Sequence, residues 1–390
     1  MECFRRVFKK WGRNRSLGGC LVATVLACSC AASNPSPPDA GNTPDAGSAP
    51  QDLAELLGPI RTARGVPALG AAVVKSGRLE ALGAVGVRKL GNATPVTHQD
   101  LWHLGSNTKA MTSTVAALLV DDGKLMWTST VGASFPELGA SLSTGYAGVT
   151  LEQLLSHRGG LPANPQSDIW AAMWQRNAEN PSVVRTWAVE EMLKRVPGTV
   201  GAFVYSNAGY MTAGRIIEKA APGEWEALVR QRLFQPLGMT SCDFGVPGTI
   251  GAVNQPWGHQ ANGSTLTPIQ GDNPLSLGPA GTAYCTLEDW AKFAAMHLKG
   301  ARGEPAMVSA AGFTKLHTPA AGGDYALGWV VTSGSRKQLW HNGSNTLWYA
   351  EVWLIPSRDV AILVTTNCAT TRCQQAVADS VFQLRESWAP

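Results

Sequence analysis

The sequence lacks the patterns that hold metals in proteins, and most of it lacks an excess of basic charge. None of the seven histidines lies in an H-E-x-x-H arrangement, and the cysteines do not have the spacing of a zinc site. The formal net charge is +4, but residues 1–27 hold six basic side chains and one acidic one, so the rest of the chain carries 4 − 5 = −1. A remainder that is not basic gives no support to nucleic-acid binding. We therefore expect no metal, no cofactor and no nucleic-acid partner.

The apolar run near the N-terminus is too short to span a bilayer. It covers residues 17–27, about half of the roughly 20 residues that a membrane helix needs. A basic stretch precedes it, and small residues follow it, which is the layout of an export signal. The run V-L-A-C that ends at Cys28 resembles the lipobox of bacterial lipoproteins, in which the cysteine becomes a lipidated N-terminus. Cys30 is a second candidate, and ordinary cleavage after Ala31 or Ala32 would instead leave a soluble exported protein.

The segment after this signal lacks the residues that build a core. Residues 33–50 contain no aromatic or large aliphatic side chain and use the sequence P-D-A-G twice. Such a segment cannot bury enough apolar surface to order itself. We therefore expect an export signal over residues 1–27, a disordered tether over residues 28–50 and an ordered domain over residues 51–390. The protein would lie in the bacterial cell envelope or periplasm, with membrane contact only through a lipid on Cys28.

Four of the eight cysteines lie in the expected ordered domain, at positions 242, 285, 368 and 373. In an oxidising compartment Cys368 and Cys373 could close a short loop, and free buried cysteines are the alternative. The sequence leaves these two states open.

The periodicity of apolar residues predicts strands at both ends of the domain and helices between them. A hairpin is expected around Ser76 and Gly77, with further strands at 325–332, 338–341, 347–355 and 360–366. A helix is expected to open at Ser106, and a last one to cover residues 374–386. This order predicts an α+β fold, in which an antiparallel sheet formed from both termini is flanked by helices. The α/β part would comprise about 51–105 and 276–390, and an inserted, mainly helical part about 106–275.

Two short motifs carry side chains suited to acyl transfer. Ser106 and Lys109 form the one S-x-x-K of the chain, and three residues apart on a helix they share one face. At a helix N-terminus a serine is well placed as a nucleophile, and the lysine can take or relay its proton.

Tyr205 and Asn207 form the one Y-x-N, on a loop before a helical pattern. A tyrosine whose pKa is lowered by a lysine can act as a general base, and an asparagine can bind a substrate amide. Taken singly, each motif is explained better by ordinary structural roles, as a capping serine with a surface lysine and as a loop tyrosine with a capping asparagine.

The order of the motifs along the chain distinguishes these alternatives. The chain contains, in this order, a strand hairpin, the S-x-x-K motif, a helical segment with Y-x-N, and a basic residue followed by x-G at a strand. Looser runs such as L-L-S-H-R-G-G-L-P and Y-A-L-G-W accompany them. This order resembles the serine β-lactamase and penicillin-recognising superfamily, in the branch of class C β-lactamases, D-alanyl-D-alanine carboxypeptidases, esterases and D-amino-acid peptidases. The resemblance extends over about residues 52–388 and implies a β-lactamase/transpeptidase-like fold.

The third motif of the superfamily can be identified only by its position along the chain. Lys75-Ser76-Gly77 spells K-S-G but lies in the first hairpin, and the H-x-G runs that begin at His103 and His157 do not lead a strand after Y-x-N. His341-Asn342-Gly343 alone occupies the expected place. The β-lactamases normally have a lysine here, which suits a substrate carboxylate, whereas histidine has a reference pKa near 6.5 and is mostly neutral at pH 7.

The resemblance implies a role for each matching residue. Ser106 would be the acylated nucleophile, Lys109 and Tyr205 the proton-transfer pair, and Asn207, His341 and Gly343 substrate-binding residues. The backbone N–H groups of Ser106 and Ser344 would form the oxyanion hole. The expected activity is hydrolysis of a small ester or D-peptide, with a class C-like β-lactamase acting on β-lactams as an alternative. A non-catalytic envelope module that keeps the fold is the alternative from another class.

Overall fold

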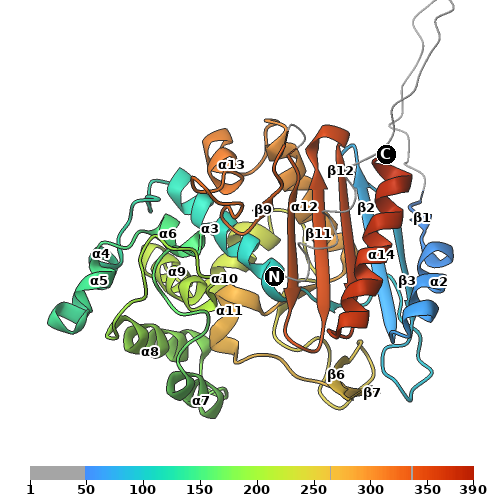
Figure 1. Ribbon diagram of the computed structural model, residues 1–390, viewed down its shortest axis with the longest axis horizontal. Helices are drawn as coiled ribbons and strands as arrows, with labels where there is room; N and C mark the ends of the chain where they lie inside the picture. Colours follow the sequence, from blue (N-terminus) through green and yellow to red (C-terminus); the bar gives the residue numbers. More distant parts are fainter. Residues whose placement is uncertain (1–48, 264, 335–336) are drawn as a thin grey trace, which may run out of the picture. The chain divides into compact units, whose positions relative to one another are not determined.

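A sheet assembled from the two ends of the domain forms the main layer of the structure (Figure 1). The computed structural model describes residues 49–390 apart from 264 and 335–336, so the predicted export signal, Cys28 and nearly all of the tether lie outside the described residues. Seven strands follow one another across the sheet in the order β1 (Gln51–Asp52), β3 (Arg78–Gly86), β2 (Ala68–Lys75), β12 (Val360–Thr366), β11 (Tyr349–Ile355), β10 (Leu339–Ser344) and β9 (Val330–Val331). All pairs are antiparallel except the edge pair β1–β3. The predicted sheet from both termini is therefore confirmed.

The turn of the first hairpin explains how the sheet begins. Ser76 and Gly77 join β2 to β3 with φ angles of 53° and 75°. Positive φ at both central residues matches the right-handed twist of a two-residue hairpin. The literal K-S-G sequence is thus a turn, as predicted.

Side chains alternate across the sheet and divide the core into two layers. Val73, Ile362 and Val364 face one side and pack with helices α2 (Ala54–Arg64) and α14 (Thr371–Trp388). Ala72 and Leu363 face the other side, which α12 (Leu287–Ala301) covers. Because successive strand residues point to opposite faces, the odd-numbered positions of β10 face the same side as α12.

The chain between the two parts of the sheet is mainly helical. Its helices are α3 (Thr108–Asp121), α4 (Val131–Ser134), α5 (Thr144–Ala147), α6 (Leu151–Leu155), α7 (Ser167–Gln175), α8 (Pro181–Leu193), α9 (Asn207–Ala220) and α10 (Trp225–Val229). After them come α11 (Gly278–Gly281) and α13 (Ala310–Leu316), on either side of α12. This middle segment also contains a hairpin that the sequence did not predict, formed by β6 (Gly258–Asn262) and β7 (Thr265–Ile269). Within the described ranges no helix is both long and apolar enough to cross a membrane.

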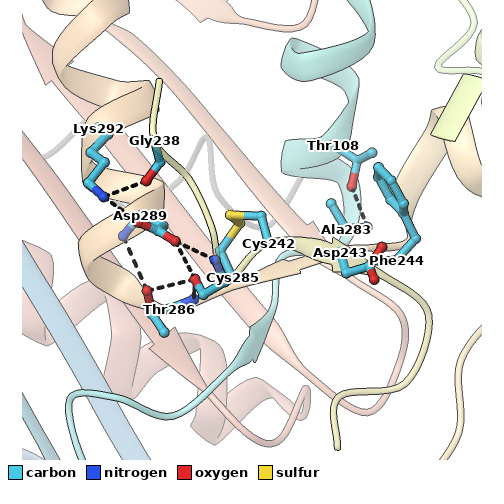
Figure 2. The surroundings of a disulfide bond; sticks show 11 residues. Thr108, Gly238, Cys242, Asp243, Phe244, Ala283, Cys285, Thr286, Asp289 and Lys292 are labelled. Carbon is cyan, nitrogen blue, oxygen red and sulfur yellow. Dashed lines mark hydrogen bonds and ion pairs between the residues drawn. A yellow bond between two sulfur atoms is a disulfide. The ribbon is translucent and has the colours of Figure 1, made fainter. Parts of the chain in front are cut away.

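A second small sheet supports the segment that leads to the S-x-x-K motif. It consists of β4 (Trp102–His103), β8 (Ala283–Cys285) and β5 (Asp243–Phe244). A disulfide joins Cys242, just before β5, to Cys285 in β8 (Figure 2). The strands of this sheet are two or three residues long, which is too short for a period-two pattern to show in the sequence.

The four cysteines within the described residues form two disulfides. Besides Cys242–Cys285, a second disulfide links Cys368 to Cys373 at the start of α14. The disulfide between Cys368 and Cys373, which the sequence left undecided, is therefore present. The other pair is separated by 43 residues, and no sequence pattern indicated that these two cysteines are bonded.

Candidate active site

Ser106 and Lys109 meet at the start of α3. Gly105–Asn107 form a 3₁₀ turn, η1, that runs directly into the helix, so Ser106 lies in its first turn as predicted. Lys109 is fully buried, and its Nζ lies 3.1 Å from Ser106 Oγ. The turn is held in place by the Thr108 hydroxyl, which donates to Gly105 O at 2.7 Å and accepts from Ala283 N of β8 at 3.1 Å (Figure 2).

The surroundings of Lys109 determine its protonation. Its Nζ donates to Asn207 Oδ1 at 2.7 Å and to the carbonyl of Ala280 at 2.7 Å. Burial lowers the pKa of Lys109 well below the usual value for lysine. A neutral amine has two N–H bonds and one lone pair, and these two oxygens accept both hydrogens. In the neutral form the lone pair would therefore be directed at the remaining neighbour, the Ser106 hydroxyl at 3.1 Å.

The Y-x-N motif lies beside this pair. Ser206 caps α9, because its Oγ accepts from Gly209 N at 2.8 Å, and this places Asn207 at the first residue of the helix. The Nδ2 of Asn207 donates to Asn164 Oδ1 at 2.7 Å, so the amide oxygen faces Lys109. The ring of Tyr205 lies 4.9 Å from Lys109 Nζ. The structure thus brings Ser106, Lys109, Tyr205 and Asn207 together.

The expected pKa change of Tyr205 is wrong in direction. Burial raises the pKa of its hydroxyl above the usual value near 10, and a hydrogen bond with Ser106 only partly offsets this effect. A lysine lowers the pKa of a tyrosine by its charge, but desolvation lowers the pKa of Lys109 itself and so weakens this effect. These opposite shifts favour Lys109 over Tyr205 as the base and Tyr205 as a proton donor.

Gly343 allows β10 to approach the nucleophile. A Cβ atom added to Gly343 would lie 2.0 Å from Leu104 O and 2.5 Å from Ser106 N. From the other side, Gly105 has a φ of 51°, and a Cβ there would lie 2.3 Å from Ser344 N. The backbone N–H groups of Ser106 and Ser344 are therefore held on neighbouring segments, as the two donors of an oxyanion hole require.

His341 faces the site but is already bonded at both ring nitrogens. Tyr325 donates its hydroxyl to Nε2 at 3.0 Å, which leaves Nδ1 as the protonated nitrogen, and Nδ1 donates to Asn342 O at 2.6 Å. Burial, together with nearby Lys109, lowers the pKa of His341 to about 3. The imidazole is thus neutral at pH 7, as the sequence suggested, and its ring has no spare donor for a substrate carboxylate.

Some residues of the site carried no recognised signal in the sequence. The carbonyl of Ala280, in α11, accepts from Lys109, and no motif marks a carbonyl. His157 Nδ1 accepts from Ser206 N at 2.9 Å, and its ring lies 4.3 Å from that of Tyr205. The H-x-G run that begins at His157 was the one sequence feature that could have pointed to this residue. Among the described residues no group of three or more histidine, cysteine or acidic side chains could hold a metal ion.

Comparison with known proteins gives a consistent result. Residues 53–385 match the protein family described as Beta-lactamase. The chain is 29% identical over 337 residues to the unguisins hydrolase ungD' of Aspergillus campestris, covering 81% of this chain and 61% of that protein. It is 31% identical over 180 residues to the lovastatin esterase of Penicillium rubens, covering 41% of this chain and 44% of that protein. The chain thus spans about three fifths of the length of the first of these relatives.

A solved structure shares the fold at lower identity. The D-amino acid amidase of Ochrobactrum anthropi aligns with a TM-score of 0.69 and 21% identity, covering 86% of this chain and 99% of that one. The α+β fold and the resemblance stated from the motifs are both confirmed by these findings. Because the family match extends over most of its length, the chain belongs to the β-lactamase family.

Proposed function

We propose that the chain is a serine hydrolase that cleaves an ester or amide through an acyl-Ser106 intermediate. The observation that carries the proposal is the contact of 3.1 Å between Ser106 Oγ and the buried amine of Lys109. A buried neutral amine whose two hydrogens are accepted elsewhere is a general base aimed at one hydroxyl.

In the acylation step, Ser106 Oγ attacks the substrate carbonyl while its proton passes to the lone pair of Lys109. The carbonyl oxygen gains negative charge, which the N–H groups of Ser106 and Ser344 would stabilise. Removing one such donor typically costs about 10²- to 10³-fold in rate. When the tetrahedral intermediate collapses, the leaving group takes a proton from the Lys109 ammonium, directly or through the hydroxyl of Tyr205.

In the deacylation step, a water molecule attacks the acyl-Ser106 ester. The Lys109 amine accepts the water proton, directly or through the Tyr205 hydroxyl, and passes it to Ser106 Oγ as the acyl–oxygen bond breaks. The proton that Ser106 loses to the leaving group in acylation is replaced by a proton from water in deacylation. The enzyme therefore returns to its starting protonation state. Asn207 keeps Lys109 in place through its Oδ1 and can bind the acyl side chain of a substrate through its amide.

The substrate class that we favour is an uncharged ester or a D-amino-acid amide or peptide. His341 is neutral and engaged with Tyr325 and the Asn342 carbonyl, so it offers no cation to the carboxylate of a penicillin. The names of the esterase relative and the amidase neighbour support the same preference. A class C-like β-lactamase remains the second candidate, because the chain belongs to that family.

The test uses a p-nitrophenyl ester, a D-Ala-D-Ala peptide and nitrocefin with the purified protein. We expect turnover of the ester or the D-peptide at least tenfold above that of nitrocefin, and mass-spectrometric labelling of Ser106 by a fluorophosphonate. Ser106→Ala should abolish both turnover and labelling without unfolding the protein. A wild-type protein that neither turns over nor labels would instead support a non-catalytic envelope module.

We further propose that the protein is exported and reaches its substrates in the cell envelope. The lipobox-like sequence before Cys28 supports anchoring, and two disulfides are typical of proteins in oxidising compartments.

A further inference from the structure

A buried histidine–carboxylate pair lies immediately before the nucleophile. His103 is the last residue of β4, three positions ahead of Ser106, and its Nε2 lies 2.9 Å from Asp272 Oδ2. The two side chains are 0% and 2% exposed, so the contact is shielded from water. None of the steps proposed for acyl transfer uses this pair. A buried charge of this kind is costly unless it is well paired, which calls for an explanation of its presence.

The tautomer of His103 follows from its second contact. The backbone N–H of Gly105 donates to His103 Nδ1 at 3.1 Å, so Nδ1 carries no hydrogen. The ring proton is then on Nε2, which lies 2.9 Å from Asp272 Oδ2 but without the alignment of a regular hydrogen bond. The carboxylate thus fixes a ring whose other nitrogen holds the backbone of Gly105, the residue directly before Ser106.

The second carboxylate oxygen of Asp272 contacts the segment that carries Ser344. Asn345 donates its Nδ2 to Asp272 Oδ1 at 3.0 Å, and Asn345 directly follows Ser344. The amide oxygen of Asn345 accepts from Leu347 N at 3.2 Å and Trp348 N at 3.1 Å, which folds the turn after β10. One carboxylate therefore holds the segment of Ser106 through His103 and the segment of Ser344 through Asn345.

We propose that His103, Asp272 and Asn345 are positioning residues that hold the two oxyanion-hole donors at a fixed separation. The inference rests on the proposed function, since it assigns these residues to the same site. Neither donor N–H belongs to the three residues themselves, so they act through Gly105 and Ser344. The close approach of Gly105 to Ser344 N makes the separation sensitive to small shifts of either segment.

The expected size of the effect follows from the geometry of such holes. A displacement of about 1 Å in a catalytic group can cost on the order of 10²-fold in rate. Substitutions of residues that contact the groups of a site, but not the ligand itself, typically lower affinity or activity about 10- to 100-fold. Because the donors bind the transition state more strongly than the substrate, the loss should appear in kcat rather than KM.

Asp272→Asn is the sharpest single substitution because it keeps the shape of the side chain. If its amide oxygen faces His103, its NH₂ group meets the Nδ2 of Asn345, and two donors face each other. If its NH₂ group faces His103, the ring must move its proton to Nδ1, which then meets the N–H of Gly105. Either orientation breaks one of the two links.

The experiment measures p-nitrophenyl acetate turnover and inhibition by phenylboronic acid, which forms a tetrahedral adduct with a serine hydroxyl. For Asp272→Asn we expect kcat to fall roughly 10- to 100-fold with KM within about threefold, and the boronate inhibition constant to rise by a similar factor. The double variant Asp272→Asn with Asn345→Asp restores a donor opposite an acceptor, and it should recover most of kcat. If Asp272→Asn does not fold, Asn345→Ser is measured in its place, with the same expectation for kcat and the boronate; it removes the amide donor to Asp272 and leaves a hydroxyl oxygen as the side-chain acceptor for Leu347 N and Trp348 N.

Asp289→Asn is the matched control for loss of a buried carboxylate. Asp289 is 4% exposed and accepts from Ser241 N, Ser241 Oγ and Lys292, and within the described residues no hydrogen bond links it to His103, Gly105 or Asn345 (Figure 2). It should lower the thermal midpoint but keep kcat within about threefold. An Asp272→Asn protein with wild-type kcat and boronate affinity would overturn the inference, as would an equal loss of kcat in Asp289→Asn or no recovery in the double variant. A wild-type protein without Ser106-dependent turnover would instead defeat the proposed function.

Discussion

At the scale of single residues, the buried amine of Lys109 links activity to stability. In the unfolded chain its pKa returns to about 10.4, whereas in the folded protein burial holds the pKa well below that value. Between the two values the unfolded state binds one proton more than the folded state. The free energy of unfolding therefore rises with pH through this window, and this contribution is lost as the pH falls toward the folded pKa.

We predict that Lys109→Met flattens the pH dependence of stability. Below about pH 10, the wild-type free energy of unfolding should rise with pH by up to about 1.4 kcal/mol per pH unit more than that of the variant. Urea unfolding of both proteins at each pH measures the difference, in which the contributions of all other groups cancel. Parallel curves would mean that Lys109 is charged in the folded protein, and the variant should in any case lose turnover.

The neutral ring of His341 gives a second prediction at this scale. With a pKa of about 3, His341 does not titrate between pH 5 and 8. We expect the pH profiles of kcat/KM for a neutral ester and for a carboxylate-bearing ester of the same leaving group to superimpose in this range. A fall of kcat/KM near pH 6 to 7 for the carboxylate-bearing ester alone would assign a substrate contact to the imidazolium.

The residues of the site were predictable from the order of their motifs, but their protonation was not. Ser106, Lys109, Tyr205 and Asn207 meet in the structure as the sequence predicted. The direction of the Tyr205 pKa was wrong, because burial depends on helices and loops that no local pattern describes. His103 was recognised as the start of an H-x-G run and set aside, since its partner Asp272 is distant in the sequence.

At the scale of elements, the contact between β10 and the 3₁₀ turn η1 depends on glycine. We predict that Gly343→Ala lowers kcat/KM by at least about 10²-fold, because its Cβ would lie 2.0 Å from Leu104 O and 2.5 Å from Ser106 N. The strand must move away from the turn, and Ser344 moves with it. Steady-state kinetics with a p-nitrophenyl ester measure the loss.

Gly58→Ala is the matched control for this substitution. Gly58 lies inside α2, and a Cβ there has nothing within 4 Å. Alanine is favoured over glycine in a helix by about 0.5–1 kcal/mol, so this variant should be slightly more stable and equally active. If Gly343→Ala also keeps its activity, the close approach of the two segments is not needed for turnover.

Elements with a long apolar period were predicted well, and short ones were not. The strands β2, β3, β11 and β12 and the helices α3 and α14 have enough residues for a period to appear. The expected strand at 325–332 is reduced to Val330–Val331, and the short strands β4, β5 and β8 were not predicted. These short strands are set by pairing with distant segments, such as Trp102 with Cys285, and by the disulfide at Cys242.

At the scale of the whole molecule, the described unit contains every residue of the candidate site. Residues 49–390 form one compact unit, and Ser106, Lys109, Tyr205 and Ser344 all lie within it. The proposed catalysis and the proposed location in the cell therefore depend on different parts of the chain. The lipid anchor proposed at Cys28 can be tested without disturbing the site.

We predict that the full-length protein, expressed in a bacterium with lipoprotein processing, partitions into the membrane fraction and incorporates radiolabelled palmitate. Cys28→Ser should abolish the label and release the protein, because a lipid on this cysteine would be its attachment to the bilayer. Cys30→Ser is the control and should behave as wild type, and both variants should turn over a p-nitrophenyl ester at the wild-type rate. Label that survives in Cys28→Ser but disappears in Cys30→Ser would move the anchor to Cys30. A soluble, unlabelled wild-type protein would show ordinary signal cleavage, and the hydrolase would then meet its substrates in free solution rather than at a membrane surface.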